Sequence, residues 1–443
     1  MPQGEFFAVQ TNKTLEFLFC ICNNVIVNIL FIECGGYDMD PIKKLIGDLP
    51  GDEWSSEYTD GATLHMSGGT PDRLKKETIE KRIAKAAERS GLHNVSCEIT
   101  NGFDELKKEY EKEELSKKKL TLSMACDEGR SEEEITLEIK VKNVIFDHDL
   151  GSDCDDGGAV AVLLNAHREG VCRALAITSC VFNPYASYCV SLMCEYFCVD
   201  DIEIGINTER DTLSSDGWWQ CSKKQAEKYY TKLGRPYPEY ESNVPLIRRK
   251  LAESRGGVTL LTTGSLTTLL PLVQSQPDDI SPLDGVELFR EKVGHYVCGG
   301  GVFPGGTQES NFLCDPVAAD KVINEYLKGY PITFFGAEVA GGTFSGIVMK
   351  QDKYKDYILR DIYEHHRPND CNHNSWDLGT MHYSVFGTTY PFFEIKKGYT
   401  VEPYGTGGCM HLYEGGVHDY VVRKVPYEAL SDTFNELIVP RDF

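Results

Sequence analysis

The stretch that decides the fold is residues 143–164, NVIFDHDLGSDCDDGGAVAVLL. Its apolar start, NVIFD, is typical of a buried β-strand, and the run from GGAVAVLL onward is typical of an α-helix. The same alternation continues along the chain. Further strands are predicted at ALAITS (174–179), IEIGI (202–206), GVTLLTTG (257–264), KVGHYVCGG (292–300) and PITFFG (331–336), with helical patterns between them. This order predicts an α/β fold, with a mostly parallel, open sheet and helices on both faces.

An acidic turn joins the first strand to its helix. Asp147, Asp149, Asp153, Asp155 and Asp156 place five carboxylates within ten residues. Anions this close repel one another, and a hard cation such as calcium relieves that repulsion. In parallel sheets ligands bind at the carboxyl ends of strands, which is where this turn lies. The turn therefore predicts a metal site, and a solvated acidic turn at a helix N-terminus is the alternative.

Two known metal-binding patterns can be compared with this turn. An EF-hand loop would require Gly and Glu where Ser152 and Gly158 stand, so that pattern does not fit. The strand-DxDx(T/V) pattern of haloacid dehalogenase-type phosphatases fits at its start, but Leu150 and Gly151 follow instead of the expected Thr or Val. It remains the second interpretation.

Composition and net charge exclude some classes of partner and location. The chain has 443 residues, with 45 basic and 68 acidic side chains and a net charge of −23. This charge repels a phosphate backbone, so we expect no nucleic-acid partner. The apolar run Leu18–Ile32 is too short for a membrane-spanning helix and is predicted to be a buried strand, so no membrane association is expected. The 16 cysteines are expected to be free thiols in a reducing compartment, which favours a cytoplasmic location and leaves secretion open.

Residues 1–141 differ in pattern from residues 142–443. Strands are expected at Phe6–Gln10 and Val25–Glu33, a helix at roughly Pro71–Ser90, and a solvated helix in the charged run 105–119. LTLSMACDE (120–128) and ITLEIKV (135–141) alternate as a β-hairpin does. We predict a small α+β region of unknown role over 1–141, followed by one catalytic domain over 142–443.

The acidic turn also resembles a family signature. VIFDHDLGSDCDDGGAVAVLL (144–164) closely resembles the strand-DxDxGxDDxxA-helix motif of the inosine-uridine-preferring nucleoside hydrolases, in the branch with DxDxGSDxDD. Five later blocks resemble segments of that family in the same order: TSCVFN (178–183), LLTTGSLTTL (260–269), HYVCGGGVF (295–303), ESNFLCDPVAADKVI (309–323) and SWDLGTMHYSVFG (375–387). The resemblance covers roughly residues 142–440.

The resemblance implies calcium-dependent hydrolysis of the N-glycosidic bond of ribonucleosides, giving ribose and a free base. It assigns the calcium to Asp149, Asp156, Asp377 and the carbonyl of Thr263, with Asp149 also as general base. It assigns substrate contacts to Asp155, Asn183, Glu309, Asn311 and, on the base side, Trp376. Asp147 and Asp153 would complete the shell. The partner is a small-molecule nucleoside, and a homodimer or homotetramer is expected.

The base side departs from the family pattern. Some members carry a histidine before the late aspartate to protonate the departing base, where this chain has Trp376. His373 or His382 could replace that histidine, although a structural role is the alternative for each, and Gln308 is the only residue near the position of a missing asparagine. Three hypotheses remain: an active hydrolase, a catalytically weak ribose-binding relative, and a haloacid dehalogenase-type phosphatase.

Overall fold

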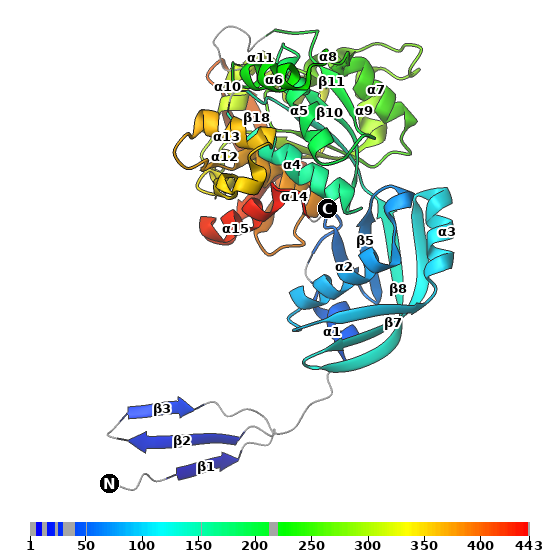
Figure 1. Ribbon diagram of the computed structural model, residues 1–443, viewed down its shortest axis with the longest axis vertical. Coiled ribbons are helices and arrows are strands. Elements are labelled where there is room, and N and C mark those ends of the chain that lie inside the picture. Colours follow the sequence, from blue (N-terminus) through cyan, green and yellow to red (C-terminus); the bar gives the residue numbers. More distant parts are fainter. Residues whose placement is uncertain are drawn as a thin grey trace.

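The computed structural model describes residues 40–49, 51–151, 153–211 and 220–441, together with the backbone of three strands nearer the N-terminus. These strands, β1 (Phe6–Gln10), β2 (Glu16–Cys22) and β3 (Val25–Ile29), pair in antiparallel fashion. The sequence predicted β1, and it predicted strand over Leu18–Ile32, where the structure has two strands, β2 and β3. The predicted burial of Leu18–Ile32 concerns side chains outside the described residues. Figure 1 shows the rest of the chain as two lobes.

The N-terminal lobe, residues 40–141, is a sheet with helices on one face. The strands, in spatial order, are β4 (Glu57–Asp60), β5 (Thr63–Gly68), β8 (Gly129–Val141), β7 (Leu115–Cys126) and β6 (Ser96–Asn101). The helices are α1 (Pro41–Asp48), α2 (Lys76–Arg89) and α3 (Phe103–Glu113). Buried apolar side chains of all three helices share one core with the sheet. The α+β character and the hairpin, β7 with β8, are as predicted.

Two boundaries in this lobe differ from the predictions. Residues Pro71–Arg73 form a short 3-10 helix, so α2 begins only at Lys76. The charged run forms a helix only to Glu113. Glu114 adopts φ 54°, and the chain then turns into β7, which takes the lysines 117–119 into the sheet.

The C-terminal lobe is built on one ten-stranded sheet. In spatial order its strands are β12 (Glu241–Ser242), β11 (Glu203–Ile206), β10 (Arg173–Ser179), β9 (Asn143–His148), β13 (Val258–Thr262), β14 (Val293–Gly299), β15 (Ile332–Phe335), β20 (His418–Arg423), β18 (Phe393–Tyr404) and β19 (Cys409–Glu414). Neighbours are parallel from β12 to β20, and β18 and β19 add an antiparallel edge. The mostly parallel sheet is confirmed, and its antiparallel edge was not predicted.

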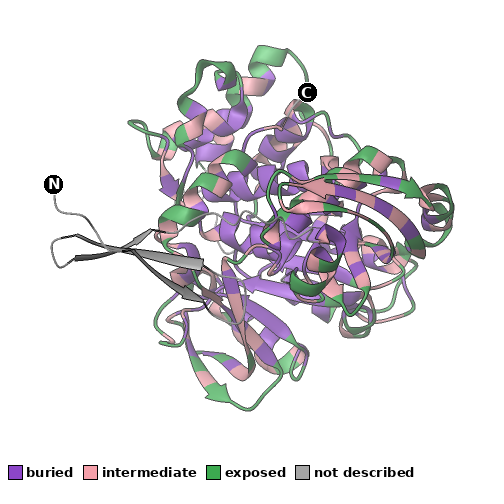
Figure 2. Ribbon diagram, turned by 90° about the horizontal axis from the view of Figure 1, so that it is seen from below, coloured by how far each residue is buried: buried purple, intermediate pink, exposed green. Residues whose placement is uncertain are grey.

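Helices cover both faces of this sheet. The longer ones are α4 (Asp155–Arg168), α5 (Tyr185–Tyr196), α6 (Gln220–Leu233), α7 (Asn243–Glu253), α9 (Gly285–Lys292), α13 (Ile358–His366), α14 (Trp376–Phe386) and α15 (Tyr427–Leu437). In β9, Val144 and Phe146 belong to one apolar core and Ile145 to the other, because successive strand side chains point to opposite faces. A strand covered on both faces has a continuous apolar sequence, as β9 does. Figure 2 shows that the central strands are buried.

Shorter helices join these elements near the strand ends. They are α8 (Leu269–Gln274), α10 (Ser310–Cys314), α11 (Pro316–Asp320) and α12 (Ala337–Ala340), and a π-helix, Lys321–Tyr326, follows α11. Asp315 caps α11, and its side chain accepts the N–H of Ala318. The helical stretch is continuous from Pro316 to Tyr326 and changes from α to π geometry at Lys321.

Two glycines at the start of α4 allow close helix packing. A Cβ on Gly158 would lie 2.6 Å from Leu378 of α14, and one on Gly157 would lie 2.5 Å from Leu359 of α13. Both distances are shorter than real carbon contacts. Small residues here bring the start of α4 against the start of α14, and so Asp155 and Asp156 approach Asp377.

The two lobes meet at the amino ends of the core strands. Lys142, directly before β9, donates its ammonium protons to the carbonyls of Trp54 and Val385, and Trp54 stacks on His295 at the start of β14. Beside them, Glu57 is paired with Arg82 and Arg89. The junction is therefore polar, and both Lys142 and Glu57 have partners there.

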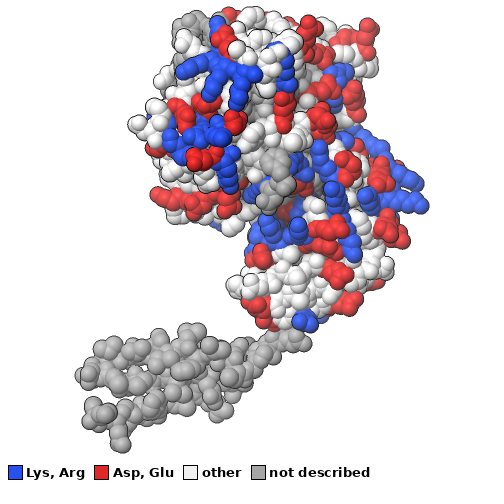
Figure 3. All heavy atoms as spheres, in the orientation of Figure 1, with Lys and Arg blue, Asp and Glu red and all other residues white. Residues whose placement is uncertain are grey.

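The remaining predictions concern the whole chain. None of the described helices is long and apolar enough to cross a membrane. All 13 cysteines in the described part of the chain are free, most of them buried, as predicted. Figure 3 shows acidic and basic side chains interspersed over both lobes on the face in view.

Candidate active site

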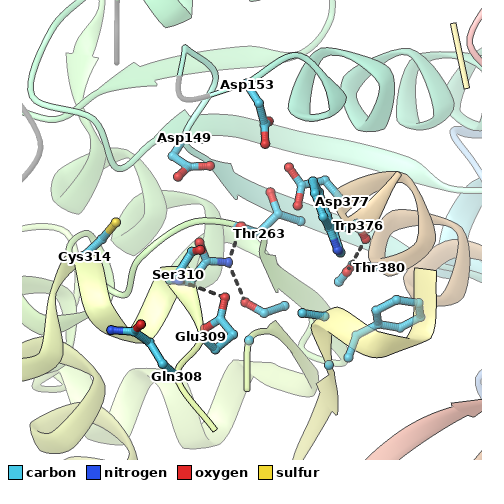
Figure 4. Close-up of a pocket in the computed structure, with 16 residues that line it drawn as sticks. Asp149, Asp153, Thr263, Gln308, Glu309, Ser310, Cys314, Trp376, Asp377 and Thr380 are labelled. Atoms are coloured by element: carbon cyan, nitrogen blue, oxygen red, sulfur yellow. Dashed lines mark hydrogen bonds between the residues drawn. The ribbon is translucent and has the colours of Figure 1, made fainter. Parts of the chain in front are cut away.

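A cavity of about 320 Å³ lies at the carboxyl ends of the central strands. Strands β9, β13, β14 and β15 all end at this edge because they are parallel. The polar and aromatic lining residues are Asp149, Asp153, Thr263, Gln308, Glu309, Ser310, Asn311, Cys314, Phe335, Trp376, Asp377 and Thr380. Figure 4 shows Asp149, Asp153 and Asp377 on one side of the cavity, with Glu309 and Gln308 on the other.

Three of the predicted metal ligands come together. Asp149, Asp156 and Asp377 each offer a carboxylate oxygen, and these oxygens lie within 4.8 Å of one another. Asp156 is held in place because its Oδ1 accepts the backbone N–H of Asp149 and the hydroxyl of Thr263, both at 3.1 Å. Its other oxygen is buried and has no partner in the described part of the chain.

The carboxyl groups behind the cavity are unfavourably placed as bare anions. Asp155 uses Oδ2 to accept the backbone N–H of Asp377 at 3.0 Å, and its buried Oδ1 has no described partner. Burial, and then repulsion by neighbouring aspartates, raises the pKa of Asp149, Asp155 and Asp377 well above their ordinary value and that of Asp156 to about 6. Unpartnered oxygens among crowded, buried carboxyls are the donor set that a hard divalent cation requires.

The Asp147 side chain bonds within the sheet and not at the cavity. Its Oδ1 accepts the hydroxyl of Thr178 on the neighbouring strand at 2.6 Å, and burial raises its pKa to about 7. It does not line the cavity and belongs to neither carboxylate group of the described residues that could hold a metal. Asp153 does line the cavity, but its carboxylate groups with a carboxylate oxygen of Asp155 and a ring nitrogen of His373.

Glu309 and Asn311 shape the opposite wall. Glu309 caps the short helix α10, and its carboxylate accepts the N–H groups of Asn311 and Phe312 at 2.8 and 3.0 Å. The Asn311 amide donates to the carbonyls of Thr263 and Gly299 at 2.6 and 2.9 Å. Asn311 therefore fixes the carbonyl that the sequence assigned to the metal, and its own amide oxygen remains available as an acceptor.

Asn183 is not brought to the cavity. Its Oδ1 accepts the N–H of Tyr185 at 2.9 Å and starts α5, so the side chain serves a turn at the end of β10. Cys314, Thr380 and the segment Phe335–Ala337 line the cavity without having been predicted. The rule that ligands bind beyond strand ends could have identified Phe335–Ala337, since these residues follow β15.

The two candidate histidines have different surroundings. His382 is fully buried among Phe386, Tyr390, Phe392, Phe393 and Phe434, and burial lowers its pKa to about 3. These apolar surroundings indicate a structural role for His382. His373 lies behind the cavity wall, with Nε2 3.7 Å from the Asp153 carboxylate.

The fold and the site define an α/β enzyme with a candidate metal centre at the carboxyl edge of its sheet. Residues 144–391, more than half of the chain, match the family described as inosine-uridine preferring nucleoside hydrolase. The chain belongs to this family and is a hydrolase acting on N-glycosyl compounds. No curated protein matches the chain.

Solved structures share the fold at low sequence identity. The type III effector protein XopQ, complexed with adenosine diphosphate ribose, has a TM-score of 0.52 and 14% identity over 67% of this chain and 92% of its own. The effector protein XOO4466 has a TM-score of 0.51 and 14% identity over 67% and 93%. An inosine-uridine preferring nucleoside hydrolase from Bacillus anthracis has a TM-score of 0.49 and 17% identity over 67% and 99%.

Proposed function

We propose that the protein hydrolyses the N-glycosidic bond of ribonucleosides with the help of a calcium ion. The observation that carries the proposal is the grouping of Asp149, Asp156 and Asp377 at a cavity that Asp149 and Asp377 line, in a chain from this family. These carboxylates and the Thr263 carbonyl would hold the ion. When bound, calcium supplies the positive charge that acidifies a water molecule and orients the ribose hydroxyls.

Asp149 is the general base in this proposal. It lines the cavity directly, and its burial among other carboxyls favours uptake of a proton. A base that faces the reacting centre and binds a proton readily can accept one from the attacking water. Asp156 does not line the cavity, so it holds Asp149 in place through the backbone N–H.

Glu309 and Asn311 are the proposed ribose contacts. Both line the cavity opposite the acidic group, and both present oxygen acceptors to a sugar hydroxyl. Asp155 supports Asp377 through its backbone bond, and Asn183 is not retained as a ribose contact because it caps α5. Buried acceptors that require hydroxyl donors discriminate against deoxyribose. Trp376 is the proposed contact of the base.

The proposal is tested by ribose release. The purified full chain is treated with a chelator, and free ribose is measured from inosine and uridine as calcium is restored. We expect activity to be lost with the metal and to return with calcium. Phosphate release from a phosphomonoester with magnesium would favour the phosphatase alternative, and nucleoside binding without any ribose release would favour the binding relative. The expected homodimer or homotetramer is tested separately by mass measurement in solution.

A further inference from the structure

The cavity carries an excess of negative charge beyond what one divalent cation balances. Asp149, Asp153, Glu309 and Asp377 line it, and Asp155 and Asp156 lie directly behind. None of the described lining residues is a lysine, arginine or histidine. Six carboxylates carry more negative charge than one divalent cation neutralises. The remaining negative potential attracts positively charged ligands.

Asp153 is the lining aspartate that the proposed metal set does not use. Behind it, His373 places Nε2 3.7 Å from the Asp153 carboxylate, and Arg367 donates its Nε–H to His373 Nδ1 at 3.0 Å. A nitrogen that accepts a hydrogen bond carries no proton, so the neutral ring has its proton on Nε2, facing Asp153. In this tautomer the Nε2–H faces the Asp153 carboxylate at 3.7 Å, beyond hydrogen-bond distance, and it offers no lone pair there for a metal.

Trp376 provides an aromatic surface in the same cavity. Its ring packs at 80° to that of His373, with centroids 5.8 Å apart. An indole face attracts cations, but it cannot protonate a departing base. Of the side chains that commonly act as the acid in that step, the described lining has no histidine, lysine or tyrosine, which leaves its carboxyl groups and the Cys314 thiol.

We propose, on the basis of the function proposed above, that the preferred substrates are N-ribosides whose base is already cationic, such as ribosylated pyridinium rings. In their hydrolysis the C1′–N bond breaks and its electron pair passes to the ring nitrogen, which cancels the positive charge. The base departs neutral and needs no proton. The water oxygen forms the new bond to C1′, and its proton passes to Asp149. Asp153 and the face of Trp376 stabilise the cationic ring before it departs.

The test compares a permanently charged substrate, N-ribosylnicotinamide, with neutral uridine in the full chain loaded with calcium. Because pyridinium rings are better leaving groups on any enzyme, the variant effect is the informative quantity. We expect Asp153→Asn to lower kcat/KM about tenfold for the cation and less than about twofold for uridine, as one lost close charge implies. Asp279→Asn, in an exposed loop between α8 and α9, is the charge-matched control and should leave both unchanged.

Four further outcomes are decisive. Equal losses on both substrates would make Asp153 a structural residue and overturn the proposal. If Asp153→Asn does not fold, the salt dependence of the parent protein replaces it, since kcat/KM for the cation should fall with ionic strength while that for uridine stays level. Equal salt dependence would also overturn it. Release of ribose from neither substrate would defeat the proposed function itself, whereas release from uridine with no selective charge effect would defeat only this inference.

Discussion

Buried carboxyl groups occur at both ends of the central sheet. At one end they are paired with arginines, whereas the cavity aspartates at the other end have no arginine partner among the described residues. At the junction with the N-terminal lobe, burial raises the pKa of Glu57, but Arg82 and Arg89 outweigh it and bring it to about 2. At the carboxyl ends, burial and neighbouring aspartates raise the pKa of Asp156 to about 6, and one of its oxygens has no described partner. Paired charges stabilise a fold, while charges left unpaired require a ligand. We call the lobe junction, with Glu57 and its arginines, the structural end of the sheet. The edge with the cavity and its aspartates is the functional end.

The largest expected effect is on catalysis at the functional end. Asp149→Asn removes the proposed base while keeping the size of the side chain, so we expect about 10²–10⁴ lower kcat even at saturating calcium. Asp377→Asn is the matched control, because it removes a ligand with no proposed proton role. Ribose release measured against calcium concentration should show substantial rescue of Asp377→Asn and almost none of Asp149→Asn. Full rescue of both would leave Asp149 as a ligand only.

The next effect is on stability at the structural end. Glu57→Gln leaves Arg82 and Arg89 partly buried without their anion, and we expect a loss of about 3 kcal/mol in the free energy of unfolding. The folded pKa of about 2 lies below the ordinary 4.5, so this stabilisation is present above pH 4.5 and is lost as the pH falls toward 2. Urea denaturation at neutral and acidic pH should show the difference shrinking in acid. The exposed Glu53→Gln provides the control, and an equal loss for both would contradict the comparison.

A smaller effect is expected when the structural end is removed. The core of the N-terminal lobe shares no residue with either core of the C-terminal lobe, so residues 142–443 are predicted to fold alone. The lost contacts of Lys142 and His295 should lower Tm by several degrees. A melting curve of this fragment gives the answer. A fragment that is insoluble or melts without cooperativity would show that both lobes depend on one structure.

The smallest effect is expected from Trp376→His. This residue lines the cavity but is not a proposed ligand, so kcat/KM should shift by a few-fold between purine and pyrimidine ribonucleosides. The new histidine can donate a proton to a neutral base. The kcat/KM for neutral substrates should therefore rise relative to that for cationic ones. Discrimination against 2′-deoxyribose should not change. Identical changes for every nucleoside would count against a role at the base.

The sequence predicted the functional end better than the structural end. The alternation of strands and helices placed Asp149 and Thr263 at one edge of the sheet, and the family resemblance added Asp377. The structure brings all three to one cavity. Asn183 also follows a strand, but a strand end does not reveal whether an asparagine side chain turns toward a ligand or caps its own helix. The partners of Lys142 were not predictable, since Val385 lies 243 residues away and no motif joins them.

Helix α14 has a consequence for which changes in length the chain can tolerate. It begins beside Asp377 at the site, and its last turn supplies the Val385 carbonyl to Lys142 at the lobe junction. One inserted residue would turn one end relative to the other by about 100° and shift it by about 1.5 Å. Either Asp377 would leave the carboxylate group or Val385 would leave Lys142. Insertions and deletions should therefore be excluded from this helix, because no change in its length keeps both ends in place.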